Sequence, residues 1–421
     1  MAWPTPSSPF RRSREVDARP VPGLAAAAGG GRGAWVNPGI PEFDAKVWEQ
    51  VDLPIYQREI EPILPPTFFD FHTHAWRRTD FSEPLSAESR ESASLVFVTD
   101  HFPFPDLQDA FRRLFPGKSV ECLSFGFPFP EMDVERNNQH IAEASRAGPG
   151  MSGLMLVRPE HGADYVRQQV VAGGFVGLKP YWAFVRGKAQ NDVLLDDMLT
   201  DEHMRVADEL GLIVLIHVPR AGRLPDPANL AGLHRLAKAF PRARMVLAHV
   251  GRSYCEWTVE QGLPAVLDLP NLYIDTTFIQ NHSVFRFLFE HFDASRVLYG
   301  SDLPNSAVHG QVVCVNGVNL FVTRRAYAWS LSPEGETLRC TYMAYESIRA
   351  IVRGADQAGL TTSDLEGVFY RNSRQLVDSV RQRLPASHPG ASGAGQAGAG
   401  AVIPPDLLPA SGHRGSPAER R

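Results

Sequence analysis

Short apolar runs alternate with longer amphipathic segments through the middle of the chain. Apolar runs bounded by turn residues are typical of buried strands, and strands that alternate with helices indicate βαβ units and a parallel sheet. Asp201–Leu210 and Leu230–Phe240 are two of the intervening segments with helical periodicity. Eight runs fit this description: Thr67–His74, Val120–Phe125, Gly153–Arg158, Phe175–Lys179, Leu212–His217, Arg244–His249, Leu272–Thr276 and Arg296–Asp302. Eight strands with intervening helices predict an α/β fold, a closed (β/α)8 barrel of the TIM type.

Both ends of the chain lack this pattern. The first 45 residues are rich in Pro, Gly, Ala, Ser and Arg, and Gly and Ala dominate between Gly390 and Gly400. Such segments bury too little apolar surface to offset the entropy lost on ordering. The sequence therefore predicts one catalytic domain at residues 46–384, between disordered tails at 1–45 and 385–421.

Five of the predicted strands end on a residue that can bind a metal or move a proton. These residues are His74, Lys179, His217, His249 and Asp302. The carboxyl ends of all strands in a (β/α)8 barrel form one rim, and the active site lies there. Residues that are scattered over the sequence are therefore expected to converge on this rim.

His72 and His74 are separated by one residue on the first predicted strand. Since side chains alternate between the two faces of a strand, both imidazoles point the same way and form half of a site for Zn²⁺, Mn²⁺ or Fe²⁺. An isolated pair of this kind is more often two hydrogen-bonded core histidines. However, His217, His249 and Asp302 each close an apolar strand as well. Three further coincidences favour a single site.

Composition and charge exclude several classes of protein. Of the 421 residues, 21% are charged and 43% are hydrophobic, as in an ordinary globular domain. The formal charge of −5, from 42 basic and 47 acidic side chains, gives no field that would attract nucleic acid or anionic lipid. No run approaches the roughly 18 apolar residues of a membrane span. Neither nucleic acid nor membrane is therefore an expected partner.

The four cysteines are Cys122, Cys255, Cys314 and Cys340, which lie far apart and form no C-x-x-C pair. Neither a disulfide framework nor a zinc knuckle is therefore expected. A reducing, cytoplasmic setting fits this pattern best.

The ordered motifs DFHTH, GFVGLKP, LIVLIHVP, RMVLAHVG, NLYIDTT and VLYGSDLP, followed by FYRNSRQL, span Phe69 to Leu376. Together they resemble the amidohydrolase superfamily, in particular its branch of amidohydrolase-related hydrolases and non-oxidative decarboxylases. The motifs are specific for the scaffold and much less so for the reaction. The resemblance implies a metal-dependent enzyme on a (β/α)8 barrel.

By this resemblance, His72 and His74 are ligands of the metal from the first strand, His217 is the ligand from the fifth strand, and Asp302 is the ligand from the eighth. His249 is the catalytic histidine, which polarises the substrate or passes on a proton. The residue types agree with these roles, because three imidazoles and a carboxylate hold Zn²⁺ with a position left open, and Asp302 can also accept a proton. One Zn²⁺ is expected, with Mn²⁺ or Fe²⁺ as alternatives.

Lys179 has three interpretations. Members of the superfamily with two metals carry a carboxylated lysine on the fourth strand, and a carboxylated Lys179 would recruit a second cation. As an amine, which we favour, it would attract a substrate carboxylate. The third interpretation is a lysine paired with a neighbouring acid at the rim.

Three arginines and three aromatic residues follow predicted strands and are candidates for substrate binding. Arginine suits bidentate recognition of a carboxylate, although arginines in loops are more often solvated or ion-paired. The aromatic residues either line the pocket or cap the barrel. The candidates are Arg158, Arg220, Arg252, Trp76, Tyr181 and Trp182.

Two acidic residues and one insertion complete the candidates. Asp70 shares the inward face of the first strand and either orients a metal ligand through a hydrogen bond or is a buried structural acid. Asp275 is interpreted as a residue that bonds to a loop rather than as a ligand. The segment 305–333 follows the last strand, and its pattern around Val312–Gly317 predicts a hairpin or lid over the metal face.

These observations leave three functions open. The first is a metal-dependent hydrolase that uses metal-activated water on a small carboxylated amide, lactone or ester. The second is a non-oxidative decarboxylase of an aromatic or unsaturated acid, in which His249 protonates the carbon that loses carbon dioxide. The third is a silent barrel that acts as a binding module, which would predict loss of the ligands. A small-molecule substrate and a homo-oligomer are expected.

Overall fold

The computed structural model describes residues 43–385, except 87–88, 90–100, 149, 328 and 333–339. The tails that the sequence predicts to be disordered, 1–45 and 385–421, lie almost entirely outside the described residues, so their disorder stays a prediction.

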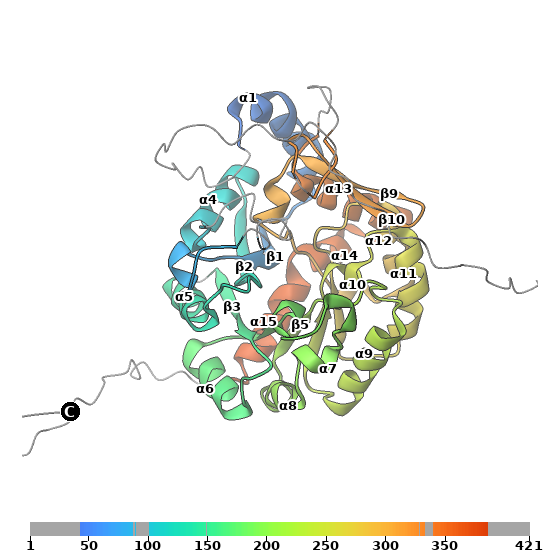
Figure 1. Ribbon diagram of the computed structural model, residues 1–421. Helices are drawn as coiled ribbons and strands as arrows, with labels where there is room; N and C mark the ends of the chain where they lie inside the picture. Colours follow the sequence, from blue (N-terminus) through green and yellow to red (C-terminus); the bar gives the residue numbers. More distant parts are fainter. Residues whose placement is uncertain are drawn as a thin grey trace, which may run out of the picture. The chain divides into compact units, whose positions relative to one another are not determined.

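Eight parallel strands form one sheet, in which each strand pairs with the next one along the chain (Figure 1). All eight coincide with predicted runs, because each run is apolar enough to be buried on both faces of a parallel sheet. The strands are β1 (Thr67–His74), β2 (Ser119–Phe125), β3 (Met151–Val157), β4 (Gly177–Pro180), β5 (Ile213–Ile216), β6 (Arg244–Leu247), β7 (Leu272–Asp275) and β8 (Val297–Leu298).

The segment that follows the short strand β8 closes the barrel against β1. The backbone N–H of Phe71 donates to the carbonyl of Tyr299 at 2.8 Å, and the N–H of Asp302 donates to the carbonyl of His72 at the same distance. A parallel bridge joins Thr73 to the residue after Asp302. The predicted closed barrel is therefore confirmed, and its seam brings Asp302 next to the histidines of β1.

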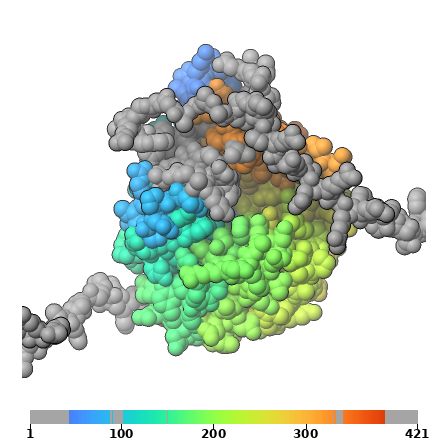
Figure 2. Space-filling view, viewed as in Figure 1, coloured from blue at the N-terminus to red at the C-terminus, as the bar shows by residue number. Residues whose placement is uncertain are grey.

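Helices connect successive strands and surround them (Figure 1), and in the same view α6 to α9 form a continuous outer surface (Figure 2). The predicted helix Asp201–Leu210 is present with these bounds, because Thr200 caps its first turn and Gly211 ends it at a φ of 64°. The main helices are α4 (Phe104–Leu114), α5 (Val134–Ala147), α6 (Ala163–Gly173), α8 (Asp201–Leu210), α9 (Pro227–Ala239), α11 (Glu256–Gly262), α12 (His282–His291), α13 (Met343–Gln357) and α15 (Asn372–Arg381). Shorter ones are α1 (Ala45–Val47), α2 (Leu53–Ile55), α7 (Leu195–Met198), α10 (His249–Arg252) and α14 (Thr362–Glu366).

The hairpin predicted within 305–333 is present as the antiparallel strands β9 (Gly310–Val315) and β10 (Val318–Thr323). Asn316 and Gly317 form its two-residue turn, with φ angles of 51° and 79°. Asn-Gly suits this position because both residues tolerate a positive φ. The next helix of the described residues along the chain is α13.

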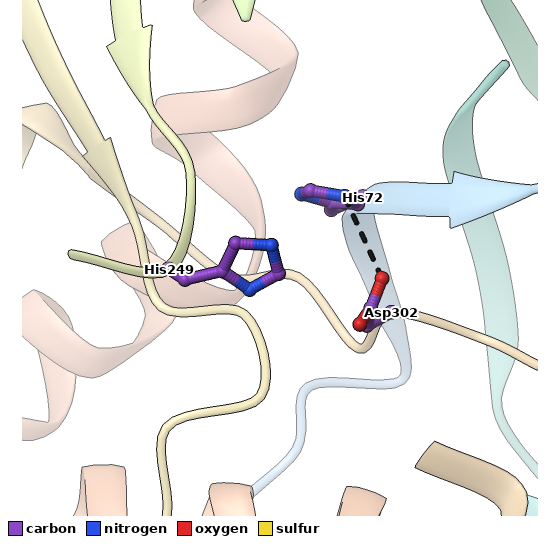
Figure 3. Close-up of side chains that lie close together, drawn as sticks. All are labelled: His72, His249 and Asp302. Carbon is purple, nitrogen blue, oxygen red and sulfur yellow. Dashed lines mark ion pairs between the residues drawn. The ribbon is translucent and has the colours of Figure 1, made fainter. Parts of the chain in front are cut away.

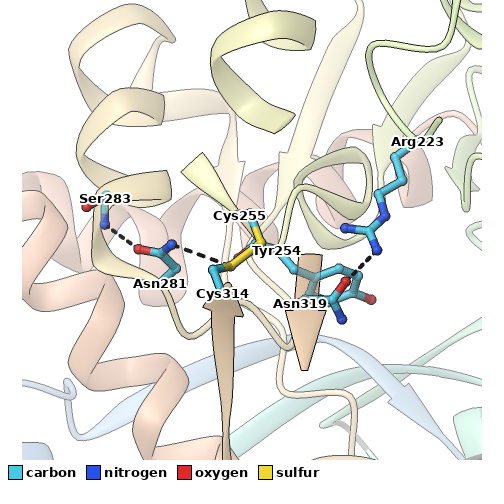
Figure 4. Close-up of a disulfide and its surroundings, with 7 residues drawn as sticks. All are labelled: Arg223, Tyr254, Cys255, Asn281, Ser283, Cys314 and Asn319. Atoms are coloured by element: carbon cyan, nitrogen blue, oxygen red, sulfur yellow. Dashed lines mark hydrogen bonds between the residues drawn. A yellow bond between two sulfur atoms is a disulfide. The ribbon is translucent and has the colours of Figure 1, made fainter. Parts of the chain in front are cut away.

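One expectation about the cysteines was wrong. Cys255, at the start of α11, forms a disulfide with Cys314 of β9, although 59 positions separate them (Figure 4). The sequence could not predict this pairing, because only the fold brings the loop after β6 beside the hairpin. The predicted reducing, cytoplasmic setting therefore loses the support of the cysteine pattern. Among the described residues, no helix is long and apolar enough to cross a membrane.

Candidate metal centre

Both histidines of β1 are buried and lie close together. His72 and His74 are each 1% exposed, and their ring centroids are 5.3 Å apart. The pairing of β1 with β2 is irregular between Asp70 and Thr73, beside His72. Such an irregularity changes the local direction of side chains and is common at active sites.

The other candidate ligands follow their strands. His217 is the first residue after β5, and its ring centroid lies 5.2 Å from that of His249, which follows β6. Asp302 follows β8 with a φ of 70°. In Figure 3, His72, His249 and Asp302 come from three separate segments and approach one another. The convergence of strand ends that the sequence predicts is thus present for these residues.

His249 begins four consecutive residues with left-handed backbone, at φ angles between 52° and 64°. This stretch, His249–Arg252, includes Val250, a β-branched residue that rarely adopts a positive φ. Left-handed backbone costs about 1–2 kcal/mol for each residue other than Gly. Such strain tends to be kept where function requires it. Here it turns the chain sharply so that His249 lies at the end of the barrel.

Three histidines use Nδ1 to hold their rings. Nδ1 of His72 lies 2.8 Å from Oδ2 of Asp275, Nδ1 of His74 lies 3.3 Å from the carbonyl of Gly126, and Nδ1 of His249 lies 3.1 Å from the carbonyl of Thr277. Each partner is an oxygen that accepts, so we assign a proton to Nδ1 of each ring. Nε2 of each ring then carries a lone pair.

Two of these lone pairs face a carboxylate. Nε2 of His74 lies 3.0 Å from Oδ1 of Asp302, and Nε2 of His72 lies 3.6 Å from the same oxygen. Electron-rich atoms that face each other in a buried site require a cation between them. Histidines that bind a metal typically donate their other N–H to a carboxylate or carbonyl. The donor set therefore fits a divalent metal.

The protonation states agree with this fit. Burial lowers the pKa of His249, and it lowers the pKa values of His72 and His217 still further, so these rings are neutral at pH 7. Burial alone would raise the pKa of Asp302, but its contact with His74 and the charges of the neighbouring histidines together lower it. Neutral imidazoles and an ionised carboxylate are the forms that bind a metal.

One ligand atom each from His72, His249 and Asp302 lies within 4.8 Å of the other two. This spacing is compatible with one ion among them. His74 adjoins the group through Asp302, and His217 adjoins it through the ring of His249. The group thus contains the residue that the sequence assigned to catalysis rather than to metal binding.

The profile of the amidohydrolase family matches residues 69–378. The chain belongs to this family. The family resemblance that the sequence motifs indicate is therefore confirmed, and the chain is an enzyme of the amidohydrolase type. A sequence comparison with curated proteins finds no match.

Solved structures similar to this amidohydrolase include a zinc-bound amidohydrolase from Burkholderia multivorans, with 11% identity over 74% of this chain and 99% of the other and a TM-score of 0.49. A 2,6-dihydroxybenzoate decarboxylase from Rhizobium has 14% identity over 74% of this chain and 99% of its own, with a TM-score of 0.43. A 4-oxalomesaconate hydratase from Rhodopseudomonas palustris has 16% identity over 75% of this chain and 99% of its own, with a TM-score of 0.47. Similarities this low carry no argument about the reaction of this chain.

A pocket of about 180 Å³ opens onto the histidines and Asp302 of this amidohydrolase. Tyr181 and Trp182, which the sequence singled out, both line it. The rest of its wall is also largely aromatic and comes from the loops after β2, β6, β7 and β8 and from the hairpin. These residues are Phe127, Pro128, Tyr254, Phe278, Asn305 and Phe321.

Lys179 lies at the buried end of β4. Its side chain is 0% exposed, and its ammonium nitrogen lies 4.9 Å from the ring centroid of Phe125 and 4.8 Å from that of Tyr181. Its Nζ has no hydrogen-bond partner among the described residues. Burial lowers the pKa of Lys179 to about 7, against the smaller opposing effect of Asp275 and Asp302. The pairing with a neighbouring acid that the sequence left open is therefore not formed within the described residues.

The three arginines proposed to bind substrate have other partners, and none lines the pocket. Arg158 donates to the carbonyl of Met132 at 2.9 Å, and its guanidinium lies over the ring of Phe184. Arg220 forms an ion pair with Asp226 at 3.0 Å. Nη1 of Arg252 lies within hydrogen-bond distance of three consecutive carbonyls that follow His217: those of Val218, Pro219 and Arg220.

Trp76 is fully buried behind the pocket wall. Its ring packs against Phe102, Phe127 and Phe129 with centroids about 6 Å away, at 6.1, 6.1 and 6.0 Å. Of these rings only Phe127 lines the pocket. The structure therefore places Trp76 as support for Phe127.

The sequence missed the relation of Asp275 to the centre. Its Oδ2 contacts Nδ1 of His72, and its Oδ1 accepts the backbone N–H of His249 at 2.6 Å. One carboxylate therefore fixes two histidines. Asp70 instead accepts the backbone N–H groups of Ser301 and His72, at 2.8 and 3.3 Å. It thus joins β1 to the segment after β8. Of the two interpretations that the sequence left open for Asp70, this contact favours a buried structural acid.

Proposed function

We propose that this amidohydrolase is a metal-dependent hydrolase that cleaves a small carboxylated amide, lactone or ester. The arrangement of His72, His74 and His249 carries the proposal: each ring is held through Nδ1, which leaves Nε2 lone pairs around Asp302. The filled ligand positions argue against a silent barrel, which would have lost them.

We assign one divalent metal, Zn²⁺ before Mn²⁺ or Fe²⁺, to His72, His74, His217 and Asp302. When bound, the metal would act as a Lewis acid that polarises the substrate and makes water a nucleophile near neutral pH. Oδ2 of Asp302 accepts the side-chain N–H of Asn305 at 3.0 Å, which fixes the carboxylate while Oδ1 points toward the histidines.

The remaining residues bind and move protons. His249 is neutral because burial lowers its pKa, and a neutral imidazole can take up a proton and return it to the leaving group. Asp302 is the second proton acceptor. We assign to Lys179, as an amine, the attraction of the substrate carboxylate, because its Nζ lies over the ring of Tyr181, which lines the pocket. The aromatic wall excludes water around the reacting atoms.

A non-oxidative decarboxylase is the second candidate, and the aromatic lining favours it. Tyr181, Trp182, Phe127 and Phe321 present flat apolar faces to a pocket of about 180 Å³, which suits a small aromatic acid. In that reaction His249 would protonate the carbon that loses carbon dioxide.

The test combines metal analysis of the purified full-length protein with an assay panel of carboxylated amides, lactones, esters and aromatic acids. Hydrolytic products without carbon dioxide support the hydrolase, and carbon dioxide without water-dependent cleavage supports the decarboxylase. A protein that binds no stoichiometric metal after reconstitution would contradict both enzymatic proposals and support a barrel that acts only as a binding module.

A further inference from the structure

A second pocket lies outside the barrel, away from the metal centre. It has a volume of about 200 Å³, and its lining comes from the start of α12, one face of α13, the segment before α12 and strand β9, which lie near one another in Figure 1. The residues are Gln280, His282, Gln311, Glu346, Arg349, Ala350 and Arg353. We propose that this pocket binds a small phosphate-type oxyanion, either inorganic phosphate or a phosphate monoester.

Gln280 is a built-in donor of the pocket. Its side chain is only 6% exposed, and its Oε1 accepts the backbone N–H of Val312 at 2.8 Å. That bond fixes the orientation of the amide, and Nε2 then has no acceptor among the described residues. A buried N–H without an acceptor is destabilising. A ligand rich in acceptor atoms would remove this cost.

The arginines of α13 add charge on the same side. Glu346, Arg349 and Arg353 stand three or four positions apart and therefore share one face of the helix. Arg349 bonds both Glu346 and Glu59 at 2.9 Å, so the nearby carboxylates already have a cationic partner. Arg353 forms no ion pair within the part of the chain that the structure describes.

The start of α12 strengthens the preference for an anion. His282 is the first residue of this ten-residue helix, so the pocket adjoins the positive end of the helix dipole; Asn281 accepts the N–H groups of Ser283 and Val284 in the first turn. Guanidinium groups and helix N-termini both bind phosphate in proteins. The unpartnered Nε2 of Gln280, the guanidinium of Arg353 and the helix dipole therefore favour an anion at this site.

The pocket is linked to the wall of the metal-side pocket. Gln280 bonds the N–H of Val312, and Val312 is the cross-strand partner of Phe321 in the hairpin. Phe321 lines the metal-side pocket. An anion that binds Gln280 would therefore hold the hairpin in place and stabilise one wall of the candidate active site.

The test measures binding of inorganic phosphate and of glycerol phosphate to the full-length, metal-loaded protein by calorimetry at constant ionic strength. Arg353→Gln and Gln280→Glu should each weaken phosphate binding at least about tenfold, because each removes a charged or buried donor. Gln280→Glu keeps the acceptor for Val312. The control Lys238→Gln removes a charge from the surface of α9 and should leave binding unchanged.

Hydrogen exchange at the amide of Val312 provides a second readout. Phosphate should slow this exchange in the wild-type protein and not in Arg353→Gln. No binding, or equal binding by the wild type and both variants, would overturn the proposal. Binding that survives Arg353→Gln but disappears when the metal is removed would assign the anion to the metal centre and would overturn it as well. None of these readouts depends on the hydrolase reaction.

Discussion

Nδ1 of His72 lies 2.8 Å from Oδ2 of Asp275, and this contact joins β1 to β7, the strands on either side of β8. The other oxygen of Asp275 holds the backbone of His249, so a single buried carboxylate orients two histidines of the centre. A ring fixed in this way presents Nε2 to the metal with its proton on the opposite nitrogen.

Asp275→Asn should therefore weaken metal binding about 10- to 100-fold, since the charge that fixes the His72 tautomer is lost. Metal affinity is measured by competition with a chelator. Asp164→Asn, at a fully exposed position, is the matched control and should bind metal like the wild type. An unchanged affinity in Asp275→Asn would contradict the orienting role.

His217→Ala and His249→Ala test the division of roles in the centre. His217→Ala should lose the metal, whereas His249→Ala should keep much of it and lose turnover. His291→Ala, which removes an exposed histidine of α12, is the control. Metal content is measured by elemental analysis after gel filtration. Equal loss of metal in both variants would instead make His249 a ligand, as its distance to His72 and Asp302 permits.

The barrel could be predicted from the sequence because each of its strands is encoded by a short stretch of neighbouring residues. Each strand is a short apolar run, and most of the candidate site residues stand at or just after the end of a run, as His217 does after Ile216. A shift of one or two positions in a strand end leaves the residue at the same rim. The convergence of His72, His249 and Asp302 therefore followed from strand order alone.

Pairings across the barrel could not be predicted in this way. Asp275 is a polar strand end like the others, and nothing in its spacing tells which histidine it faces. The partners of Arg158, Arg220 and Arg252 depend on loop conformations, and so does the distance between Cys255 and Cys314. Phe321 reaches the pocket only because the hairpin folds back over the barrel end.

Arg252 offers a test of positioning against substrate binding. Its Nη1 holds three carbonyls of the loop after His217, while its backbone ends the left-handed stretch that begins at His249. Arg252→Met should lower the free energy of unfolding by about 1–3 kcal/mol, because buried carbonyls lose their donor. Arg252→Lys should recover part of this loss. Unfolding in urea measures it, and a weaker substrate affinity with unchanged stability would favour the binding role instead.

Lys179 should make stability depend on pH. Burial lowers its pKa to about 7 from an ordinary value of 10.5, so between these values the unfolded chain holds a proton that the folded chain has released. The free energy of unfolding should therefore rise with pH from about 7 to 10.5, with a slope of up to about 1.4 kcal/mol per pH unit. This contribution is lost progressively as the pH falls from 10.5 to about 7 and is absent below that pH.

Lys179→Met should remove that slope, which urea unfolding of the metal-free protein at several pH values measures. Lys238→Met, on the exposed surface of α9, should retain it. An identical pH dependence in the wild type and Lys179→Met would contradict the assignment of the slope to this lysine.

The disulfide between Cys255 and Cys314 should stabilise the fold by tying the hairpin to the loop that follows His249. A cross-link over 59 positions removes conformational entropy from the unfolded chain worth about 4 kcal/mol. The double variant Cys255→Ser/Cys314→Ser should unfold at lower urea concentration by a corresponding amount, and a dithiol reductant should destabilise the wild type but not the double variant. Cys340→Ser, which changes a cysteine outside the disulfide, is the control.

Four titratable thiols in the unreduced, denatured protein would contradict the bond. Two would leave the hairpin covalently anchored beside Tyr254, which lines the metal-side pocket.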